Sequence, residues 1–184
     1  MRDTTAMDRL DAGGCKLVLV DYQARLMPAI HDGDVVISNA LRLAGGARLL
    51  GIDVLGTEQN PAGLGPNVEA LRQHCASTLA KMHFDACEDG LLARLGETSA
   101  VVIAGCEAHV CLLQTGLGLR RAGRQVWVVA DACGSRAPAD HVLAMQRLRD
   151  AGAVIAGTEM VLFEWLHDCR HPAFKAFLTL VKGR

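Results

Sequence analysis

Aromatic side chains are scarce in this sequence, which has two Trp, one Tyr and four Phe. Long apolar runs are absent too, whereas a membrane-spanning helix needs about 20 apolar residues in a row. The first fifteen residues carry three Asp and lack the apolar stretch of a signal peptide. Basic and acidic residues nearly cancel, at 19 Lys and Arg against 20 Asp and Glu, without the basic patch that nucleic acid requires. We therefore expect a cytoplasmic protein with no membrane or nucleic-acid partner.

The cysteine pattern argues against a disulfide framework. The chain has seven cysteines, an odd number, and no two of them form a Cys-x-x-Cys pair. This usage is typical of a reducing cytosol, where most cysteines are small buried side chains. Cys106, His109 and Cys111 are spaced like metal ligands, but a fourth zinc ligand is missing nearby. We therefore expect no metal and no other cofactor.

The apolar pattern alternates between strands and helices along the whole chain. Short runs rich in Val, Ile, Leu and Ala predict buried strands, over residues 16–21, 53–57, 78–81, 100–104, 125–130 and 153–156. Helices are expected over residues 36–50, 68–74, 88–95, 108–122 and 138–151, with one more from residue 158 and a last one opened by Pro172. Asp34 and Thr158 are candidate helix caps.

This alternation favours an α/β fold. We predict a three-layer αβα sandwich around a mostly parallel, Rossmann-like sheet of about six strands. Residues 1–14 are expected to form a flexible leader and residues 15–184 a single domain. Gly116 and Gly118 fall inside a predicted helix, so they indicate close helix packing rather than a dinucleotide-binding loop.

Three polar residues fall at or just beyond the ends of predicted strands. Asp21 ends the first strand, Lys81 ends the third, and Cys111 lies in the first turn of the helix that follows residues 100–104. Because the carboxyl ends of parallel strands share one edge, these side chains could converge. N–H groups at a helix start favour a thiolate and could hold an oxyanion, and a carboxylate can take the thiol proton. Taken singly, each residue has a structural alternative: packing for the cysteine, a turn for Asp21 and a solvated side chain for Lys81.

The segments around these residues resemble the isochorismatase-like hydrolase superfamily. The resemblance rests on Leu17–Gln23, on Val101–Thr115 with its Gly-Cys-Glu-Ala-His-Val-Cys turn, and on Val126–Arg136 with Asp-Ala-Cys-Gly-Ser. Thr57–Gly65 and His171–Lys175 are similar to the isochorismatase domain-containing protein 2 branch. The resemblance covers residues 15–182 and implies the isochorismatase-like hydrolase fold.

The resemblance also implies a catalytic site. By motif, the family's triad falls on Asp21, Lys81 and Cys111. The family carries a cis peptide bond that would lie here between Cys106 and Glu107. It would turn the N–H of Glu107 toward that of Cys111, so that the two form an oxyanion hole.

Four further residues are predicted to contact the substrate. They are Gln23, Glu58, Phe84 and His109. Glu58 and the neighbouring Gln59 could equally cap their loop, and Phe84 could equally be core. His109 is expected to form the pocket wall or a subunit contact rather than to act as a base, because side chains two positions apart on a helix point in different directions.

Two departures from the family pattern narrow the expected chemistry. Residues 57–61, Thr-Glu-Gln-Asn-Pro, stand where metal-dependent nicotinamidases carry histidine ligands, so no metal is expected. True isochorismatases lack the cysteine, and its presence favours acyl transfer. We predict a metal-independent cysteine hydrolase that cleaves a C–N bond of a small amide or carbamoyl compound through a thioester, and that forms a homo-oligomer. The alternatives are a binding or scaffold protein of the same fold, or a redox-sensing thiol.

Overall fold

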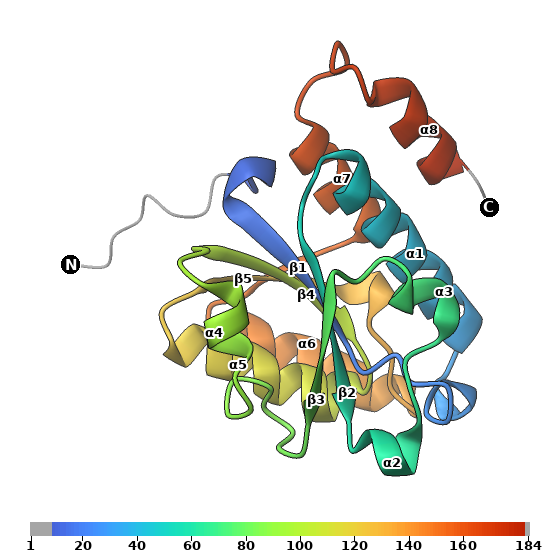
Figure 1. Cartoon of the computed structure of the whole chain (residues 1–184), viewed down its shortest axis with the longest axis vertical. Helices are drawn as coiled ribbons and strands as arrows, with labels where there is room; N and C mark the ends of the chain where they lie inside the picture. The colour runs from blue at the N-terminus through green and yellow to red at the C-terminus, as the bar shows by residue number, and fades with distance from the viewer. Residues whose placement is uncertain (1–8, 183–184) are drawn as a thin grey trace.

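The computed structural model describes residues 9–182. The six strands in this part of the chain form one sheet. All neighbouring strands are parallel, in the order β3-β2-β1-β4-β5-β6 (Figure 1). The strands are β1 Cys15–Val20, β2 Val54–Gln59, β3 Ser77–Lys81, β4 Ala100–Gly105, β5 Gln125–Val129 and β6 Val154–Ala156. Helices cover both faces, which confirms the predicted three-layer sandwich.

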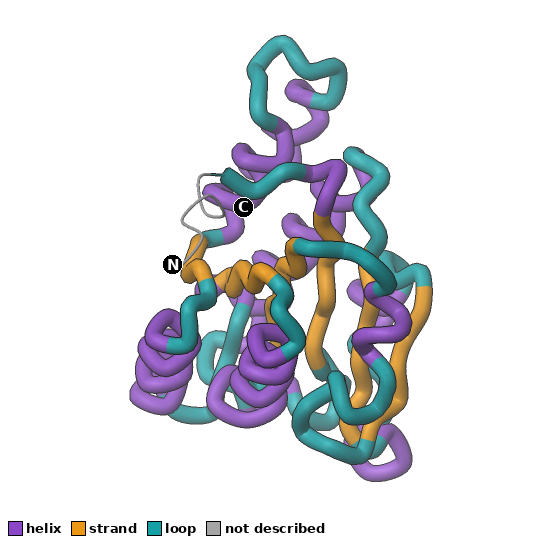
Figure 2. The backbone as a smooth tube through the Cα atoms, turned by 90° about the vertical axis from the view of Figure 1, so that its left-hand side faces the viewer, coloured by secondary structure: helices purple, strands orange, loops and turns teal. Residues whose placement is uncertain are grey.

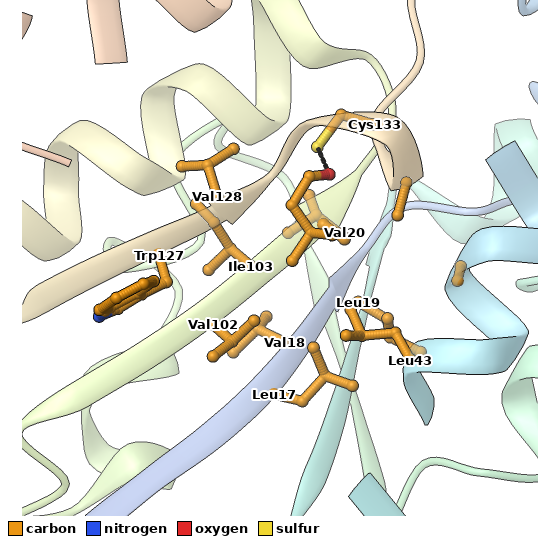
Figure 3. Close-up of a cluster of buried hydrophobic side chains, with 14 of the residues drawn as sticks. Leu17, Val18, Leu19, Val20, Leu43, Val102, Ile103, Trp127, Val128 and Cys133 are labelled. Carbon is orange, nitrogen blue, oxygen red and sulfur yellow. Dashed lines mark hydrogen bonds between the residues drawn. The ribbon is translucent and has the colours of Figure 1, made fainter. Parts of the chain in front are cut away.

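The central strands β1 and β4 are buried along nearly their whole length. They pair from Cys15 with Ala100 to Val20 with Gly105. Figure 3 shows their apolar side chains packed together, with Leu43 of a covering helix against Leu19. Strands covered on both faces need continuous apolar runs instead of an alternating pattern. Each buried Val, Leu or Ile stabilises the fold by about 1.5–3 kcal/mol.

The helices divide between the two faces of the sheet. Their bounds are α1 Gly33–Leu49, α2 Pro61–Leu64, α3 Glu69–Arg72, α4 Leu91–Leu95, α5 Leu113–Arg121, α6 Pro138–Asp150, α7 Thr158–Leu166 and α8 Phe174–Lys182. Helix α1 packs on β1 and β2 and contacts α3, α7 and α8, whereas α5 packs on β5 and α6 on β6 (Figure 1). Figure 2 shows the helices and strands of the same fold from the side. Within residues 9–182, no helix is both long and apolar enough to cross a bilayer.

The order of the strands reverses at β1. The chain passes from β1 outward to β2 and β3, then returns to the other side of β1 to form β4, β5 and β6. In open parallel sheets, ligands bind beyond the carboxyl ends of the strands at such a switch point. Gly105 permits the close approach of β4 to β1 there, because a Cβ at this position would lie 2.2 Å from the carbonyl oxygen of Val20. The residues that follow β1 and β4 are therefore held side by side.

The two predicted helix caps make different contacts. Asp32, in a left-handed conformation, precedes α1, and Asp34 lies inside its first turn, where a carboxylate still favours the helix dipole. Gly157 precedes α7, and the backbone N–H and hydroxyl of Thr158 both donate to Oδ1 of Asp131 at 2.8 Å. The side chain of Asp131, which follows β5, therefore satisfies the start of α7 in place of Thr158.

The helix predicted over residues 108–122 is not regular. It begins as a π-helical turn over Ala108–Leu112 and continues as α5. Gly116 and Gly118 pack closely, as predicted: a Cβ would lie 2.6 Å from Leu148 at the first and 2.2 Å from Asp85 at the second.

The predicted leader divides into two parts. Residues 1–8 lie outside the described residues. Residues 9–14 pack against the domain: Leu10 is buried, and its N–H donates to the carboxylate of Glu164 on α7 at 2.8 Å. A short 3₁₀ turn, Ala12–Gly14, then leads into β1. This segment differs from the expected leader because it buries an apolar side chain.

Candidate active site

The carboxylate of Asp21 lies just beyond β1. The backbone φ of Asp21 is 53°, in the left-handed region that Asp enters more readily than most residues. Its side chain is fully buried, and the hydroxyl of Thr57 donates to Oδ1 at 2.6 Å. The N–H of Asp21 also donates to the carbonyl of Thr57 at 3.2 Å. Thr57, on β2, therefore fixes both the backbone and the carboxylate of Asp21.

The ammonium of Lys81 lies against this carboxylate. Lys81 ends β3, two strands away from β1, and its Nζ is 2.8 Å from Oδ2 of Asp21. Neither side chain has any exposed surface. The ammonium also donates to Oε1 of Gln59 at 2.6 Å and to the carbonyl of His83 at 3.3 Å. Burying an ion pair carries a large desolvation cost, which the acceptors around this ammonium offset here.

The thiol of Cys111 faces the same ion pair. Cys111 lies in the π-helical turn beyond β4, and such turns are frequent at functional sites. The negative charge of Asp21 and the positive charge of Lys81 both act on the sulfur and shift its pKa in opposite directions. Its Sγ is 3.8 Å from Oε1 of Gln59. The structure therefore brings the three predicted residues together, although 90 positions separate the first from the last.

The pKa of the Cys111 thiol is raised, whereas the sequence led us to expect a lowered value. Burial raises the pKa of Cys111 to about 12; the negative charge of Asp21 also raises it, and the positive charge of Lys81 lowers it. We expected the helix start to favour a thiolate, but burial has the larger effect. The resting sulfur is therefore protonated at neutral pH. It needs a base before it can attack, and the carboxylate of Asp21 is adjacent.

Gln59 completes the cluster, and sequence reasoning left its role open. It ends β2, and its Nε2 donates to the carbonyl of Met82 at 2.8 Å. Gln23 holds its backbone from both sides: the N–H of Gln59 donates to Oε1 of Gln23 at 2.8 Å, and its carbonyl accepts from Nε2 at 3.0 Å. Gln23 has no exposed surface, and these two bonds position Gln59; the predicted contact of Gln23 with substrate stays a prediction. The alternation of side chains along β2 could have indicated that Gln59 shares the face of Thr57.

The other predicted substrate contacts differ in their exposure and in their hydrogen-bond partners. The carboxylate of Glu58 accepts from the N–H of Asn67 at 2.8 Å, which is the loop contact expected as its alternative role. Phe84 is 50% exposed, and its carbonyl lies 3.5 Å from the Lys81 ammonium. His109 is half-buried, and its Nδ1 lies 2.9 Å from the hydroxyl of Ser135. Phe84 and His109 therefore remain candidates for a pocket wall.

The predicted oxyanion-hole segment connects β4 to the turn that carries Cys111. The peptide bond between Cys106 and Glu107 is cis. The carbonyl of Glu107 accepts from the N–H of Val110 at 3.1 Å, and its carboxylate accepts from Nε of Arg136 at 2.7 Å. Among residues 9–182, the backbone N–H of Glu107 has no hydrogen-bond acceptor. That N–H is therefore free to donate to another group.

The donor set of this cluster does not suit a metal ion. Within the described part of the chain, His, Cys, Asp and Glu side chains form no group of three that could hold one. The ammonium of Lys81 also occupies the place beside Asp21 that a cation would need.

Comparison with known proteins decides the family. The family model of the isochorismatase domain matches residues 15–160. The chain belongs to the isochorismatase family. Human isochorismatase domain-containing protein 2 is 36% identical over 180 residues, which cover 96% of this chain and 87% of the human protein. The predicted superfamily and branch are thereby confirmed.

Solved structures of this family share the fold across almost the whole chain. A Caenorhabditis elegans protein described as the MAR1 ribonuclease has a TM-score of 0.90 and 32% identity, covering 95% of this chain and 92% of that protein. The YcaC product of Escherichia coli, described as an octameric hydrolase of unknown specificity, has a TM-score of 0.86 and 28% identity, over 94% and 88% of the two chains. YcaC from Pseudomonas aeruginosa, solved with hexane-2,5-diol and covalent acrylamide, has a TM-score of 0.88 and 26% identity, over 96% and 93%. This member of the isochorismatase family therefore has a hydrolase fold.

Proposed function

We propose that this isochorismatase-family protein is a metal-independent cysteine hydrolase that cleaves a C–N bond of a small amide or carbamoyl compound. The observation that carries the proposal is the meeting of Asp21, Lys81 and Cys111 at the switch point of the sheet. A carboxylate, an ammonium and a thiol in one buried cluster provide a base, a positive charge and a nucleophile. The covalent acrylamide in the related Pseudomonas aeruginosa structure also supports it, because acrylamide reacts with nucleophiles such as thiolates.

In the first half-reaction, the proton of the Cys111 thiol moves to the carboxylate of Asp21 as the sulfur attacks the substrate carbonyl. The new C–S bond turns the carbonyl oxygen into an oxyanion, which accepts hydrogen bonds from the N–H groups of Glu107 and Cys111. The ammonium of Lys81 lies 2.8 Å from this carboxylate and stabilises the negative charge that develops in the cluster. The C–N bond then breaks, and Asp21 returns its proton to the leaving ammonia or amine.

In the second half-reaction, a water molecule attacks the thioester on Cys111. Asp21 takes a proton from this water, the C–O bond forms, and the C–S bond breaks. The sulfur leaves and is reprotonated by Asp21, which restores the resting thiol and the ionised carboxylate. Phe84 and His109 are proposed to form the wall against which the acyl group lies.

The test is ammonia release from a panel of small primary amides and hydantoin-like carbamoyl compounds. Cys111→Ala should lose at least about 10³-fold in rate, as removal of a nucleophile typically does. Cys169→Ala is the matched control. Cys169 is exposed, so this variant should hydrolyse the substrate at the wild-type rate. Near-normal turnover by the Cys111 variant would end this mechanism.

One observation favours a second candidate, a binding protein that keeps the cleft without turnover. Cys111 is buried, and its pKa of about 12 leaves it protonated at neutral pH. If the wild type releases no ammonia from the panel, and if iodoacetamide labels Cys111 no faster than Cys169, the binding role is the better description.

We also propose that the chain assembles into a homo-oligomer in a reducing cytosol. The related Escherichia coli protein is described as octameric, and Val142 and Leu143 on α6 leave apolar surface exposed. The seven cysteines are all unpaired. Light scattering coupled to gel filtration should give at least twice the 19.6 kDa mass of the chain. A monomer at micromolar concentration would contradict the assembly.

The cluster suits a small neutral substrate better than RNA, despite the name of the Caenorhabditis elegans relative. The ammonium of Lys81 is paired with Asp21 and sealed from solvent, so it is not presented to a phosphate backbone. Electrophoretic shift assays with short single-stranded RNA should show no binding at physiological salt.

A further inference from the structure

Two residues of the catalytic cluster reach the surface. Cys111 keeps 6% and Gln59 keeps 9% of their surface exposed, against 0% for Asp21 and 1% for Lys81. Sγ of Cys111 and Oε1 of Gln59 are 3.8 Å apart, so a molecule that reaches the sulfur lies close to the carboxamide of Gln59. The ion pair behind them is covered.

The carboxamide of Gln59 is fixed as a hydrogen-bond acceptor. Its Nε2 donates to the carbonyl of Met82, and its Oε1 accepts from Nζ of Lys81 at 2.6 Å. Gln23 holds the backbone of Gln59 through two hydrogen bonds. If the amide were rotated by half a turn, its NH₂ group would face the ammonium of Lys81 and its oxygen would face the carbonyl of Met82, and both hydrogen bonds would be lost. The oxygen of Gln59 therefore stays directed into the cluster.

This oxygen can accept one more hydrogen bond. A carbonyl oxygen has two acceptor sites, and Lys81 uses one of them. The other faces Sγ of Cys111 at 3.8 Å, where the resting thiol is its donor. When the thiol proton moves to Asp21, this second site loses its donor within a buried cluster. An acceptor left without a partner there is costly, so a donor on the substrate would be favoured.

We propose that Gln59 is a specificity residue that accepts an N–H from the substrate and selects amides and carbamoyl compounds over esters. This inference rests on the proposed hydrolase function. An ester places an oxygen where the amide nitrogen would lie, which sets two acceptors against each other. Sites built to hydrogen-bond a substrate N–H reject analogues that lack it much more strongly than apolar pockets discriminate by size.

A matched pair of thiol reagents tests the role without knowledge of the natural substrate. Acrylamide and methyl acrylate differ in the amide and ester groups, and both form a C–S bond to a thiolate. Labelling of Cys111 is measured by peptide mass spectrometry and divided by labelling of the exposed Cys169 in the same chain. In the wild type, Cys111 should react faster than Cys169 and should prefer acrylamide after this correction.

The variant Gln59→Met removes the acceptor at similar side-chain length. The corrected preference for acrylamide should fall about tenfold, the loss expected for one hydrogen bond. Gln59→Leu provides a second apolar replacement if the first variant does not fold, and Gln59→Glu, which keeps an acceptor, should retain most of the preference. Gln146→Met, at an exposed position on α6, is the matched control and should behave as the wild type.

The possible results separate this inference from the function on which it rests. If Cys111 of the wild type reacts no faster than Cys169 with either reagent, the proposed hydrolase fails and the specificity role fails with it. If Cys111 reacts faster but Gln59→Met slows both reagents equally, Gln59 only positions Lys81 and the specificity role is overturned. An unchanged preference in Gln59→Met overturns it as well, while the hydrolase proposal stands.

Discussion

The substitution Asp21→Asn separates the proposed base from a merely structural carboxylate. It keeps the size of the side chain and an oxygen for the Thr57 hydroxyl, and it removes the negative charge beside Lys81. The free thiol has a pKa of about 12, partly because of this charge, so the variant should have a lower Cys111 pKa. The carboxylate that we propose as proton acceptor is lost at the same time.

The expected loss of stability and the expected loss of rate in Asp21→Asn follow from the burial of the Asp21–Lys81 ion pair. Removing one partner of a buried pair costs about 3–5 kcal/mol of stability, and the three remaining acceptors of Lys81 should keep the loss near the lower end. General base catalysis contributes about 10²–10⁴-fold to a rate, so hydrolysis should fall by that factor. Asp53→Asn is the matched control. It breaks the surface pair with Lys16, in which the Asp53 side chain is 60% exposed, and should cost at most about 1 kcal/mol.

The assay is the rate of Cys111 alkylation by iodoacetamide as a function of pH. If Asp21 takes the proton during attack, the wild-type rate should be nearly flat from about pH 6 to 9. In Asp21→Asn the proton must go to solvent, so the rate should rise about tenfold per pH unit. A tenfold rise per unit in the wild type, or a flat profile in the variant, would refute the reasoning.

Three other substitutions probe the packing around the site. Thr57→Val removes the hydroxyl that holds Asp21 and should lower hydrolysis about tenfold, measured as kcat/KM, because a buried carboxylate oxygen loses its donor. Gly118→Ala should destabilise the fold by about 1–3 kcal/mol in urea unfolding, because the new Cβ would lie 2.2 Å from Asp85. Burial raises the pKa of Cys133 to about 12. The contribution of this thiol to stability is therefore present below about pH 9 and is lost as the pH rises toward 12. Cys133→Ala should reduce this alkaline loss of stability by about 1.4 kcal/mol per pH unit, measured by calorimetry under reducing conditions.

Each of these predictions has a result that would count against it. An unchanged kcat/KM in Thr57→Val would mean that Asp21 needs no second anchor. Gly14→Ala, where a Cβ meets nothing within 4 Å, is the control for Gly118→Ala, and equal stability of the two variants would contradict the packing argument. An alkaline slope that Cys133→Ala leaves unchanged would show that this thiol does not titrate on unfolding.

The sheet could be predicted from the sequence because its strands are buried on both faces. Val101–Ala104 and Leu17–Val20 are continuous apolar runs, which burial on two faces requires. The start of the helix after β4 could not be predicted, because a π-helical turn at Ala108–Leu112 has no periodic signal of its own. The cap of α7 was also hidden, since Asp131, which supplies it, is distant in sequence from Thr158.

The positions of the candidate catalytic residues were more predictable than their electrostatics. Parallel strands place Asp21 and Lys81 at one edge, so their proximity follows from the topology. The high pKa of Cys111 depends on burial by residues from several elements, which a helix-start argument omits. Gln59 and Gln23 exchange hydrogen bonds between the ends of β1 and β2, and no single-strand pattern shows that pairing.

The central claim is a covalent acyl intermediate on Cys111. The direct measurement is rapid acid quench during turnover of an amide from the panel, followed by peptide mapping by mass spectrometry. The account predicts a hydroxylamine-sensitive acyl mass on the peptide that contains Cys111, and none on the Cys169 peptide. Turnover without such an adduct, together with an unreduced rate in Cys111→Ala, would contradict it.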